Sequence, residues 1–375
     1  MISQSQSQSL FHPSGTPTVT DKEYKRSTRN FQDSVACLSW HKDENPNILA
    51  CSAWDATLSV HYVTARNREV STVENVYEGA SRNFLTPFIS LGWQSTERKL
   101  IAGNIDGSIH LIDLNDFPIS DQIGKHDDAV KGVYYLEESR TICSLSYDRT
   151  MKFWDPRTQG QIISFNLGAK PVCSDMLFPN IAIGLSNEKL LIFDMIRDIN
   201  AVFRERDNYY INSPLGSDSP MSALSISKEN AIGIGNYDGR SNLSKFERRS
   251  DGTVSLNNIV TFKAHKIDPG QNGNTSRLKI LYPIHAVGLH PLNRNTYFTA
   301  GGDGCVNFWD IPARNKLSFF TCTNTPITAA KYSSNGKLLA YAYGYDYAKG
   351  IEGERTIKPK LHIHSTQLDE LARVE

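Results

Sequence analysis

The residues best suited to chemistry lie in short glycine-rich stretches that each contain one acid. In "GGDGCVNFWD" (301–310), three glycines surround Asp303. Such a loop could cradle a phosphate through its backbone N–H groups, or offer carboxylate oxygens to a metal. The same letters are typical of a tight turn between two strands, because Val306 and Phe308 alternate with other residues behind the turn.

Signatures of catalysis and nucleotide binding are missing from the sequence. The stretch "GIGNYDG" (233–239) falls short of G-x-G-x-x-G and precedes no helical pattern, and neither G-x-S-x-G nor a P-loop occurs. His362 and His364 alternate in "LHIHS" without a third ligand nearby in the sequence. We therefore expect no catalytic residue, no metal and no cofactor.

Composition and charge favour a soluble intracellular protein. The 40 basic side chains balance 40 acidic ones, so nucleic-acid binding would depend on a local basic patch. Six scattered cysteines without a C-x-x-C pair favour reduced thiols. No apolar run approaches the ~20 residues of a membrane-spanning helix. The Ser/Gln-rich start lacks a signal-peptide pattern and predicts a disordered tail over 1–30.

The glycine-rich stretch has six sister copies along the chain, and each contains an acid or Asn at the same point. The shortest separations between these residues, 39 to 43 positions, match the period of about 40–45 residues of a propeller blade. The seven turn residues are Asp55, Asp106, Asp148, Asn187, Asp238, Asp303 and Asp346.

Every unit also holds two apolar segments before the turn and one after it, all with period-2 alternation. A fourth, more variable strand fits each linking stretch. The pattern predicts an all-β, seven-bladed propeller over 31–366, followed by a C-terminal tail over 367–375. Longer linking stretches at 64–83, 196–218 and 248–281 are expected to be loops on one rim.

The turn acids have a structural role in this reading. His126 precedes Asp148, and Ser146 and Trp154 are available to complete a buried polar relay. His265 stands before Asp303 in the same way, and Trp309 anchors the strand behind that turn.

Aromatic residues immediately precede four of the seven turn residues, and basic residues gather near the same turns. Because equivalent turns of a propeller lie on one face, we expect a partner-binding surface there. Such a surface suits acidic peptide motifs, and equally phosphates with stacked bases. Its candidate residues are Trp54, Tyr147, Tyr237, Tyr345, Arg240, Lys266 and Lys349.

Two long segments resemble one branch of the WD-repeat family. They are "HDDAVKGV…SLSYDRTMKFWDPR" and "FKAHK…LYPIHAVGLHPLNRNTYFTAGGDGCVNFWDIPARNKL". This branch contains the nuclear-pore mRNA export factors and their sisters, the spindle-checkpoint WD proteins. The likeness runs from about residue 33 to 365. The last unit, "NGKLLAYAYGYDYAKGIE", is similar to the export factors, whereas "WDPRT" resembles the corresponding stretch of the checkpoint proteins.

The resemblance implies a non-enzymatic adaptor, a monomeric propeller within a heteromeric complex, that supports mRNA export. Its partner would be an FG-repeat nucleoporin that docks a GLEBS-type hairpin, with weak binding of single-stranded RNA besides. It would reside in the nucleus and at the nuclear envelope and shuttle to the cytoplasm. The residues that match the family's hairpin site are Trp54, Tyr147, Arg240, Lys266 and Tyr347.

Departures from the family pattern make this face less positive. "SPLGSDSP" (213–220) lacks the family's Lys and Arg, Tyr147 and Tyr347 replace Trp, and Lys266 replaces Arg. We therefore expect a changed hairpin or weaker binding, and a weaker contact with RNA.

Two other functions compete with this one. A checkpoint adaptor would use the same face for kinase hairpins and phosphorylated kinetochore repeats. An enzyme or small-ligand propeller would need converging polar residues on its innermost strands, and "FISLGW" (88–93) and "ITAAKY" (327–332) do not offer them.

Overall fold

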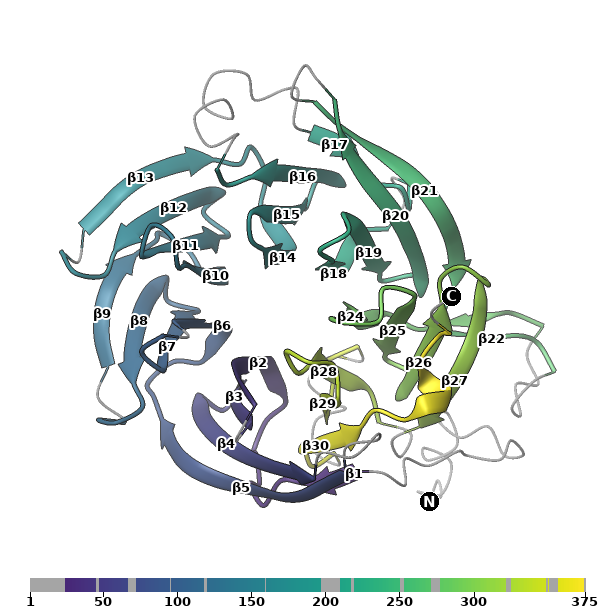
Figure 1. Ribbon diagram of the computed structural model, residues 1–375, viewed down its shortest axis with the longest axis horizontal. Helices are drawn as coiled ribbons and strands as arrows, with labels where there is room; N and C mark the ends of the chain where they lie inside the picture. Colours follow the sequence, from purple (N-terminus) through teal and green to yellow (C-terminus); the bar gives the residue numbers. More distant parts are fainter. Residues whose placement is uncertain are drawn as a thin grey trace, which may run out of the picture.

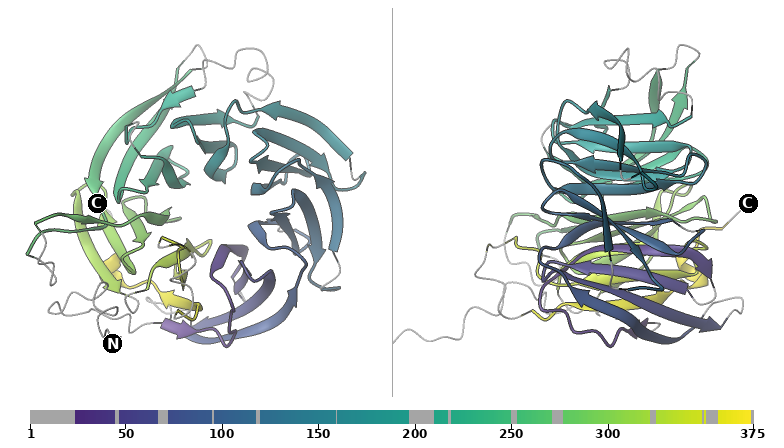
Figure 2. Two further views of the ribbon diagram at one scale, coloured as in Figure 1. Left: turned by 180° about the vertical axis from the view of Figure 1, so that it is seen from behind. Right: turned by 90° about the vertical axis from the view of Figure 1, so that its left-hand side faces the viewer.

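The computed structural model shows seven four-stranded antiparallel sheets around a central channel (Figure 1). The sheets stand side by side as the blades of a disc (Figure 2). This confirms the all-β, seven-bladed propeller expected from the repeats. The residues that the structure describes are 24–44, 47–66, 72–94, 96–117, 120–158, 160–196, 210–216, 219–249, 253–270, 277–321, 325–348, 350 and 357–373.

Blades 1 to 3 each use four consecutive strands, ordered from the channel to the rim. Blade 1 consists of β2 (Val35–Glu44), β3 (Asn47–Ala53), β4 (Thr57–Arg66) and β5 (Thr72–Asn83). Blade 2 consists of β6 (Phe88–Gln94), β7 (Lys99–Asn104), β8 (Ser108–Asp113) and β9 (Ser120–Lys125). Blade 3 consists of β10 (Val130–Leu136), β11 (Thr141–Ser146), β12 (Thr150–Asp155) and β13 (Gly160–Asn166).

Blades 4 to 6 follow the same order. Blade 4 consists of β14 (Pro171–Leu177), β15 (Asn180–Leu185), β16 (Lys189–Asp194) and β17 (Tyr210–Asn212). Blade 5 consists of β18 (Met221–Ile226), β19 (Ala231–Asn236), β20 (Arg240–Arg248) and β21 (Val254–Lys263). Blade 6 consists of β24 (Ile284–Leu289), β25 (Thr296–Gly301), β26 (Cys305–Asp310) and β27 (Asn315–Thr321).

Blade 7 is closed by the two ends of the chain. Its inner strands are β28 (Ile327–Tyr332), β29 (Leu338–Tyr343) and β30 (Lys360–Ser365), and its outer strand is β1 (Tyr24–Arg26). β1 pairs antiparallel with β30, with Tyr24 opposite His364. Blade 7 therefore includes residues 24–26, which lie within the stretch expected to be an N-terminal tail. Three residues are too short to show a periodic pattern of their own.

The C-terminal segment packs against the ring instead of leaving it. A short 3₁₀ helix, η3 (Leu368–Glu370), follows β30. The buried Glu370 carboxylate lies 2.9 Å from His364 Nε2, and the Ala372 N–H donates to Thr296 Oγ1 of blade 6. The part of 367–375 that the structure describes thus ties blade 7 to blade 6.

Apolar side chains fill the space between every two neighbouring blades. Among the described residues there are seven such clusters, one for each pair of neighbours around the ring. Blade 6 contributes Phe298 and Val306 to one of them, and blade 7 contributes Leu339 and Tyr341. Both faces of a blade are therefore covered, which is why a strand such as β3 is buried at every residue.

Two of the expected rim loops contain strands. The stretch 64–83 contains the end of β4 and all of β5, and 248–281 contains β21 and the two-residue strands β22 (Lys266–Ile267) and β23 (Ile280–Leu281). An outermost strand has one face in solvent, so its alternation is weak and sequence patterns miss it. Of the third stretch, 196–218, residues 197–209 and 217–218 lie outside the described residues.

Three further features concern the described ranges alone. Their helical content is η3, so no helix there is long and apolar enough to cross a membrane. No group of three His, Cys, Asp or Glu side chains in them is placed to hold a metal. Their five cysteines are free thiols, and Cys322 lies outside these ranges.

Candidate functional site

One face of the disc carries the turns between the second and third strands of all blades; we call it the turn face. Each of these turns is tied to the linker that leads into its own blade by the same backbone hydrogen bond. In each pair the N–H of the turn residue donates to the carbonyl oxygen of the linker residue: Trp54 to Ser34, Ile105 to Pro87, Tyr147 to Ala129, Ser186 to Lys170, Tyr237 to Pro220, Gly302 to Pro283 and Gly344 to Pro326. Turns and linkers therefore form one surface around the mouth of the channel.

A buried relay supports the turn of blade 3. The His126 Nδ1–H donates to Asp148 Oδ2 (2.8 Å), and His126 Nε2 accepts from the Ser144 hydroxyl (2.7 Å). Trp154 Nε1–H donates to the same Ser144 oxygen (2.8 Å). This assignment of the tautomer follows from the carboxylate, which can only accept.

The relay uses Ser144 where the sequence pointed to Ser146. Ser146 instead donates to the backbone oxygen of Asp128 (2.8 Å) and fixes the linker. The two serines are two residues apart on β11 and share one face of the strand, so periodicity could not choose between them.

Burial and hydrogen bonding shift the pKa values of His126 and Asp148 in the directions that favour a neutral histidine and a charged acid. Burial lowers the pKa of His126 below its ordinary value, although Asp148 acts against the shift. Burial alone would raise the pKa of Asp148, but hydrogen bonds from Thr150 and His126 leave it lowered. The turn acid is therefore an acceptor that holds the turn, with its oxygens occupied by Thr150 and His126.

Blade 6 repeats the relay with a threonine. His265 Nδ1 lies 2.8 Å from Asp303, His265 Nε2 lies 2.9 Å from Thr299 Oγ1, and Trp309 Nε1–H donates to that oxygen (3.0 Å). The glycine-rich stretch is thus a turn between strands, and Gly304 adopts a φ of 73° that favours glycine.

Among the described residues, three aromatic side chains are exposed on the turn face. Trp54 is 42% exposed, Tyr237 54% and Tyr347 39%. Tyr147 is half-buried, and the Lys170 ammonium lies 5.6 Å from the centre of its ring. Lys170 lies in the linker before β14 and is a further candidate residue of this surface, to which no sequence pattern pointed.

Tyr345 is not part of this exposed set, contrary to the expectation from its place before Asp346. It is 6% exposed, and its hydroxyl donates to the Gly350 carbonyl oxygen (2.6 Å). Its ring packs against Tyr347, with 5.1 Å between ring centres. Blade 7 therefore presents Tyr347 on the surface, with its hydroxyl directed to the Asp33 carboxylate (2.9 Å).

The basic residues of the site differ in how free they are. Arg240 opens β20, and its Nε is shielded from solvent without a hydrogen-bond partner in the described part of the chain. Lys266 is held in a 2.6 Å ion pair with Asp268, which Lys279 also approaches at 3.3 Å. Lys349 lies outside the described residues.

Acids lie among these groups and limit the positive charge of the face. Asp128 pairs with Lys170 at 3.4 Å, and Asp33 accepts the Tyr347 hydroxyl. Asp346 lies 3.2 Å from His285 Nε2. Burial would raise the pKa of Asp346, but the hydrogen bond from His285 leaves it lowered. The turn face therefore carries both acidic and basic groups.

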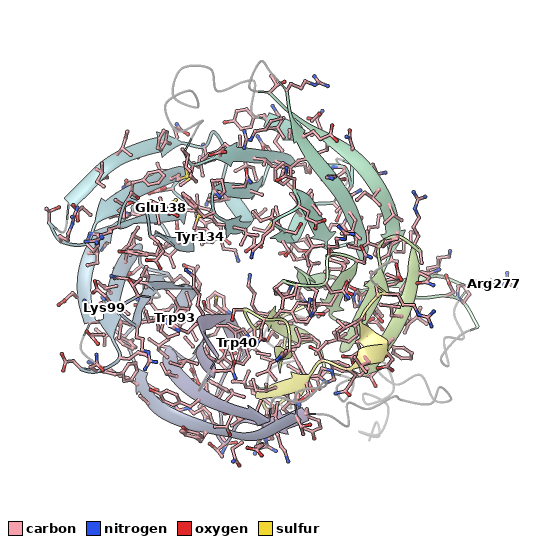
Figure 3. All side chains as sticks on the ribbon, in the orientation of Figure 1. Trp40, Trp93, Lys99, Tyr134, Glu138 and Arg277 are labelled. Atoms are coloured by element: carbon pink, nitrogen blue, oxygen red, sulfur yellow. The ribbon has the colours of Figure 1, made fainter. Side chains whose placement is uncertain are left out.

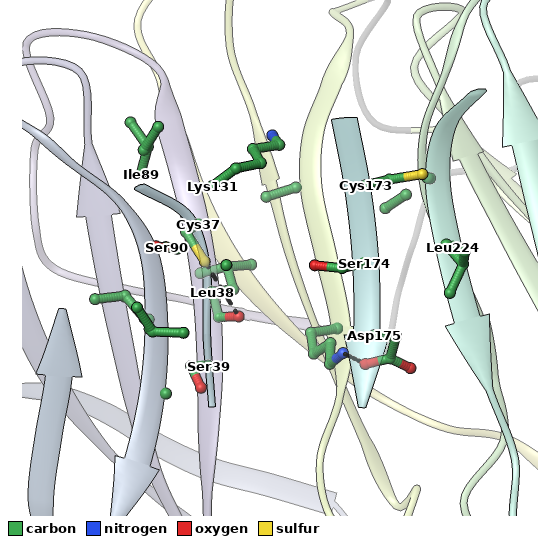
Figure 4. Close-up of a pocket in the computed structure, with 18 of the residues that line it drawn as sticks. Cys37, Leu38, Ser39, Ile89, Ser90, Lys131, Cys173, Ser174, Asp175 and Leu224 are labelled. Atoms are coloured by element: carbon green, nitrogen blue, oxygen red, sulfur yellow. Dashed lines mark hydrogen bonds and ion pairs between the residues drawn. The ribbon is translucent and has the colours of Figure 1, made fainter. Parts of the chain in front are cut away.

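The central channel holds a cavity of about 420 Å³ lined by the innermost strand of every blade. Trp40, Trp93 and Tyr134 come from three consecutive blades around it (Figure 3). The Lys331 ammonium of blade 7 forms a 3.2 Å ion pair with Asp175 of blade 4 (Figure 4). The expectation that the innermost strands offer no converging polar residues is wrong, because ring closure brings together residues 156 positions apart.

Comparison with known proteins bears on the whole ring. A model of the family "WD domain, G-beta repeat" matches residues 120–155, which span β9 to β12. Protein Rae1 of Drosophila melanogaster is 27% identical over 340 residues, 89% of this chain and 91% of its own length. The Poly(A)+ RNA export protein of Schizosaccharomyces pombe is 25% identical over 372 residues, 97% of each chain.

This chain is a WD-repeat homologue of the mRNA export factors. The mRNA export factor GLE2 of Chaetomium thermophilum extends the same result, with 26% identity over 346 residues, 90% of this chain and 89% of its own length. The likeness covers nearly the whole chain in each case.

Solved structures support the fold of this WD-repeat homologue. The WD40 repeats of RRP9 match it with a TM-score of 0.66 and 16% identity, covering 93% of this chain and 99% of that one. The structure of U3-55K matches with a TM-score of 0.67 and 16% identity. At this identity the likeness concerns the architecture alone.

Proposed function

We propose that the protein is a non-enzymatic adaptor in mRNA export at the nuclear pore. Its turn face would bind an acidic, GLEBS-type hairpin of an FG nucleoporin. The names of the relatives support the process, and the geometry of the turn face supports the mode of binding. The protein would accordingly reside in the nucleus and at its envelope and shuttle to the cytoplasm.

One observation carries this proposal. Trp54, Tyr237 and Tyr347 are exposed around one channel mouth, where a large aromatic surface in water costs free energy unless a partner covers it. Arg240 lies on the same face, and its solvent-shielded Nε has no hydrogen-bond partner among the described residues. Aromatic anchors beside a guanidinium are typical of interfaces that hold acidic segments.

The acids of this face are engaged in holding turns, which favours binding over catalysis. Asp148 and Asp303 each accept hydrogen bonds from a buried histidine and from the turn backbone. A carboxylate whose oxygens already accept these hydrogen bonds is poorly placed to take up and release a proton.

Single-stranded RNA would bind more weakly than the hairpin. The stretch 213–220 lacks basic residues, and Lys266 is neutralised by Asp268. We expect RNA affinity to fall steeply as salt is raised, since phosphate contacts depend on released counterions.

The test is a calorimetric titration of the full chain with a GLEBS-type hairpin peptide. In the double variant Arg240→Glu with Lys266→Glu, the loss of paired charges should weaken binding by about 30-fold or more. The matched control is Arg294→Glu with Lys337→Glu, which reverses two charges in turns on the opposite face and should bind as the parent does. A double variant with parental affinity would refute the site.

Localisation tests the process separately. A tagged copy should mark the nuclear rim, and its depletion should leave polyadenylated RNA in the nucleus. Kinetochore foci without a nuclear rim would contradict the proposal and favour the checkpoint adaptor.

A further inference from the structure

The innermost strand of every blade contains a β-bulge at its turn-face end. In each case the first and third residues of the strand pair with consecutive residues of the second strand, so the second residue is extra. A bulge re-aims the side chain of its extra residue. These seven residues, which we call the bulge ring, are Ala36, Ile89, Lys131, Val172, Ser222, His285 and Thr328, and all of them line the channel cavity.

Lys131 differs from the other six residues of the bulge ring, which are either apolar or hydrogen-bonded. Ala36, Ile89 and Val172 are apolar. The polar members have partners: Ser222 Oγ donates to Ile284 O (2.5 Å), His285 Nε2 meets Asp346 (3.2 Å) and Thr328 Oγ1 donates to Ala342 O (3.4 Å). No hydrogen bond or ion pair joins the Lys131 ammonium to any residue within the described ranges.

The acid among the lining residues of the cavity, Asp175, cannot serve as this partner. Asp175 already receives Lys331 at 3.2 Å and the Ile226 N–H at 3.0 Å. It lies three strand positions deeper than the bulge ring, which at about 3.3 Å per residue is about 10 Å. Figure 4 shows Lys131 level with Ile89 and well separated from the Asp175 ion pair. Lys131 is therefore a cation at the mouth, with a closed ion pair beneath it.

The surroundings of Lys131 connect it to the aromatic residues of the turn face. Burial raises the pKa of the Tyr237 hydroxyl, and the positive charge of Lys131 acts against that rise while Tyr147 adds to it. Tyr147 and Tyr237 belong to the turns of blades 3 and 5, one on either side of the blade 4 turn, which carries the small Ser186. Lys131 lies at the turn-face end of the blade 3 innermost strand and lines the channel cavity.

We propose that Lys131 binds the carboxylate of one acidic side chain that the partner peptide inserts into the channel mouth between Tyr147 and Tyr237. The proposal rests on the proposed function and names the charge that this site recognises. A single carboxylate satisfies a single ammonium. A nucleic-acid backbone fits less well, because it repeats its charge at every nucleotide, and Asp33, Asp128 and Asp346 on the same face would repel the phosphates that lie beyond Lys131.

The experiment compares Lys131→Met with Lys131→Arg in calorimetric titrations of the full chain with the GLEBS-type hairpin peptide. Methionine retains the length of the side chain without the charge, and arginine retains the charge. We expect Lys131→Met to weaken binding by about 30-fold or more and Lys131→Arg by less than about threefold. Equal melting temperatures of the three proteins establish that the fold is unchanged.

A charge exchange identifies the partner atom. Each acid of the hairpin is changed to lysine in turn, and one of these peptides should bind Lys131→Glu better than it binds the parent. Parental affinity in Lys131→Met would overturn the inference while leaving the proposed function standing. A hairpin that fails to bind the parent would instead overturn the proposed function. Loss of single-stranded oligonucleotide binding in Lys131→Met, with hairpin binding unchanged, would overturn the inference in favour of RNA.

Discussion

The indole N–H of Trp154 donates a 2.8 Å hydrogen bond to Ser144 Oγ, and this bond joins the third strand of blade 3 to its second. Ser144 also reaches His126, which holds the turn acid Asp148. A chain of hydrogen bonds thereby runs from the turn acid Asp148 through His126 and Ser144 to Trp154 inside the blade. The turn that presents Tyr147 rests on this scaffold, so site geometry and blade stability are linked there.

The relay of blade 6 gives a clean stability test. Thr299→Val retains the shape of the side chain but removes the oxygen that serves His265 and Trp309, leaving buried polar groups unpaired. We expect a loss of about 1–3 kcal/mol in the free energy of unfolding, measured by urea denaturation. Thr299→Ser is the control, because it retains the hydroxyl and loses only a methyl group. Equal losses in both variants would show that the hydroxyl has no special role.

Stability should fall in mild acid because of His290. Its Nδ1 accepts backbone N–H groups from Leu292 and Asn293, and burial lowers its pKa to about 4. The unfolded histidine, with an ordinary pKa near 6.5, takes up a proton first, so the contribution is present above pH 6.5 and is lost as the pH falls toward 4. We expect a loss of about 2 kcal/mol between pH 7.5 and pH 5 from this residue.

The measurement is urea denaturation of the parent and of His290→Asn across that pH range. The asparagine amide oxygen can accept the same N–H groups without titrating, so the variant should depend less on pH. A pKa of His290 above 6.5 by NMR would contradict the argument.

Trp54 should act as an anchor of the binding surface. Its side chain is exposed at 42%, so Trp54→Ala removes partner contact with little effect on the fold. We expect hairpin affinity to fall by about tenfold or more in titration calorimetry, with an unchanged melting temperature. Leu292→Ala, which removes a 69% exposed side chain on the opposite face, is the matched control and should bind like the parent.

Closure of the ring should depend on the short strand β1. A chain that begins at residue 30 lacks the β1–β30 pairing, the Ser27–His61 hydrogen bond and the Arg29–Glu78 ion pair. We expect its melting temperature to fall by roughly 5 °C or more. A chain that begins at residue 24 retains all three and is the control; equal melting temperatures would show that β1 adds nothing to closure.

The sequence alone determined the architecture of the ring, because the signals for it are local. Alternation with period 2 defines the three inner strands of each blade, and glycine with an acid defines each turn, as in 301–310. It also pointed to the histidine–acid pairs of blades 3 and 6, since a histidine stands in the linker before each of these two turns.

Tertiary structure decided which residues face which, because that depends on contacts between segments far apart in the chain. The choice of Ser144 over Ser146, the burial of Tyr345 and the closure by β1 all require packing or pairing that no local pattern encodes. Lys131 is the clearest case. In the sequence it is one lysine in an ordinary strand, and only a bulge and a closed ring of seven blades aim it into the channel mouth.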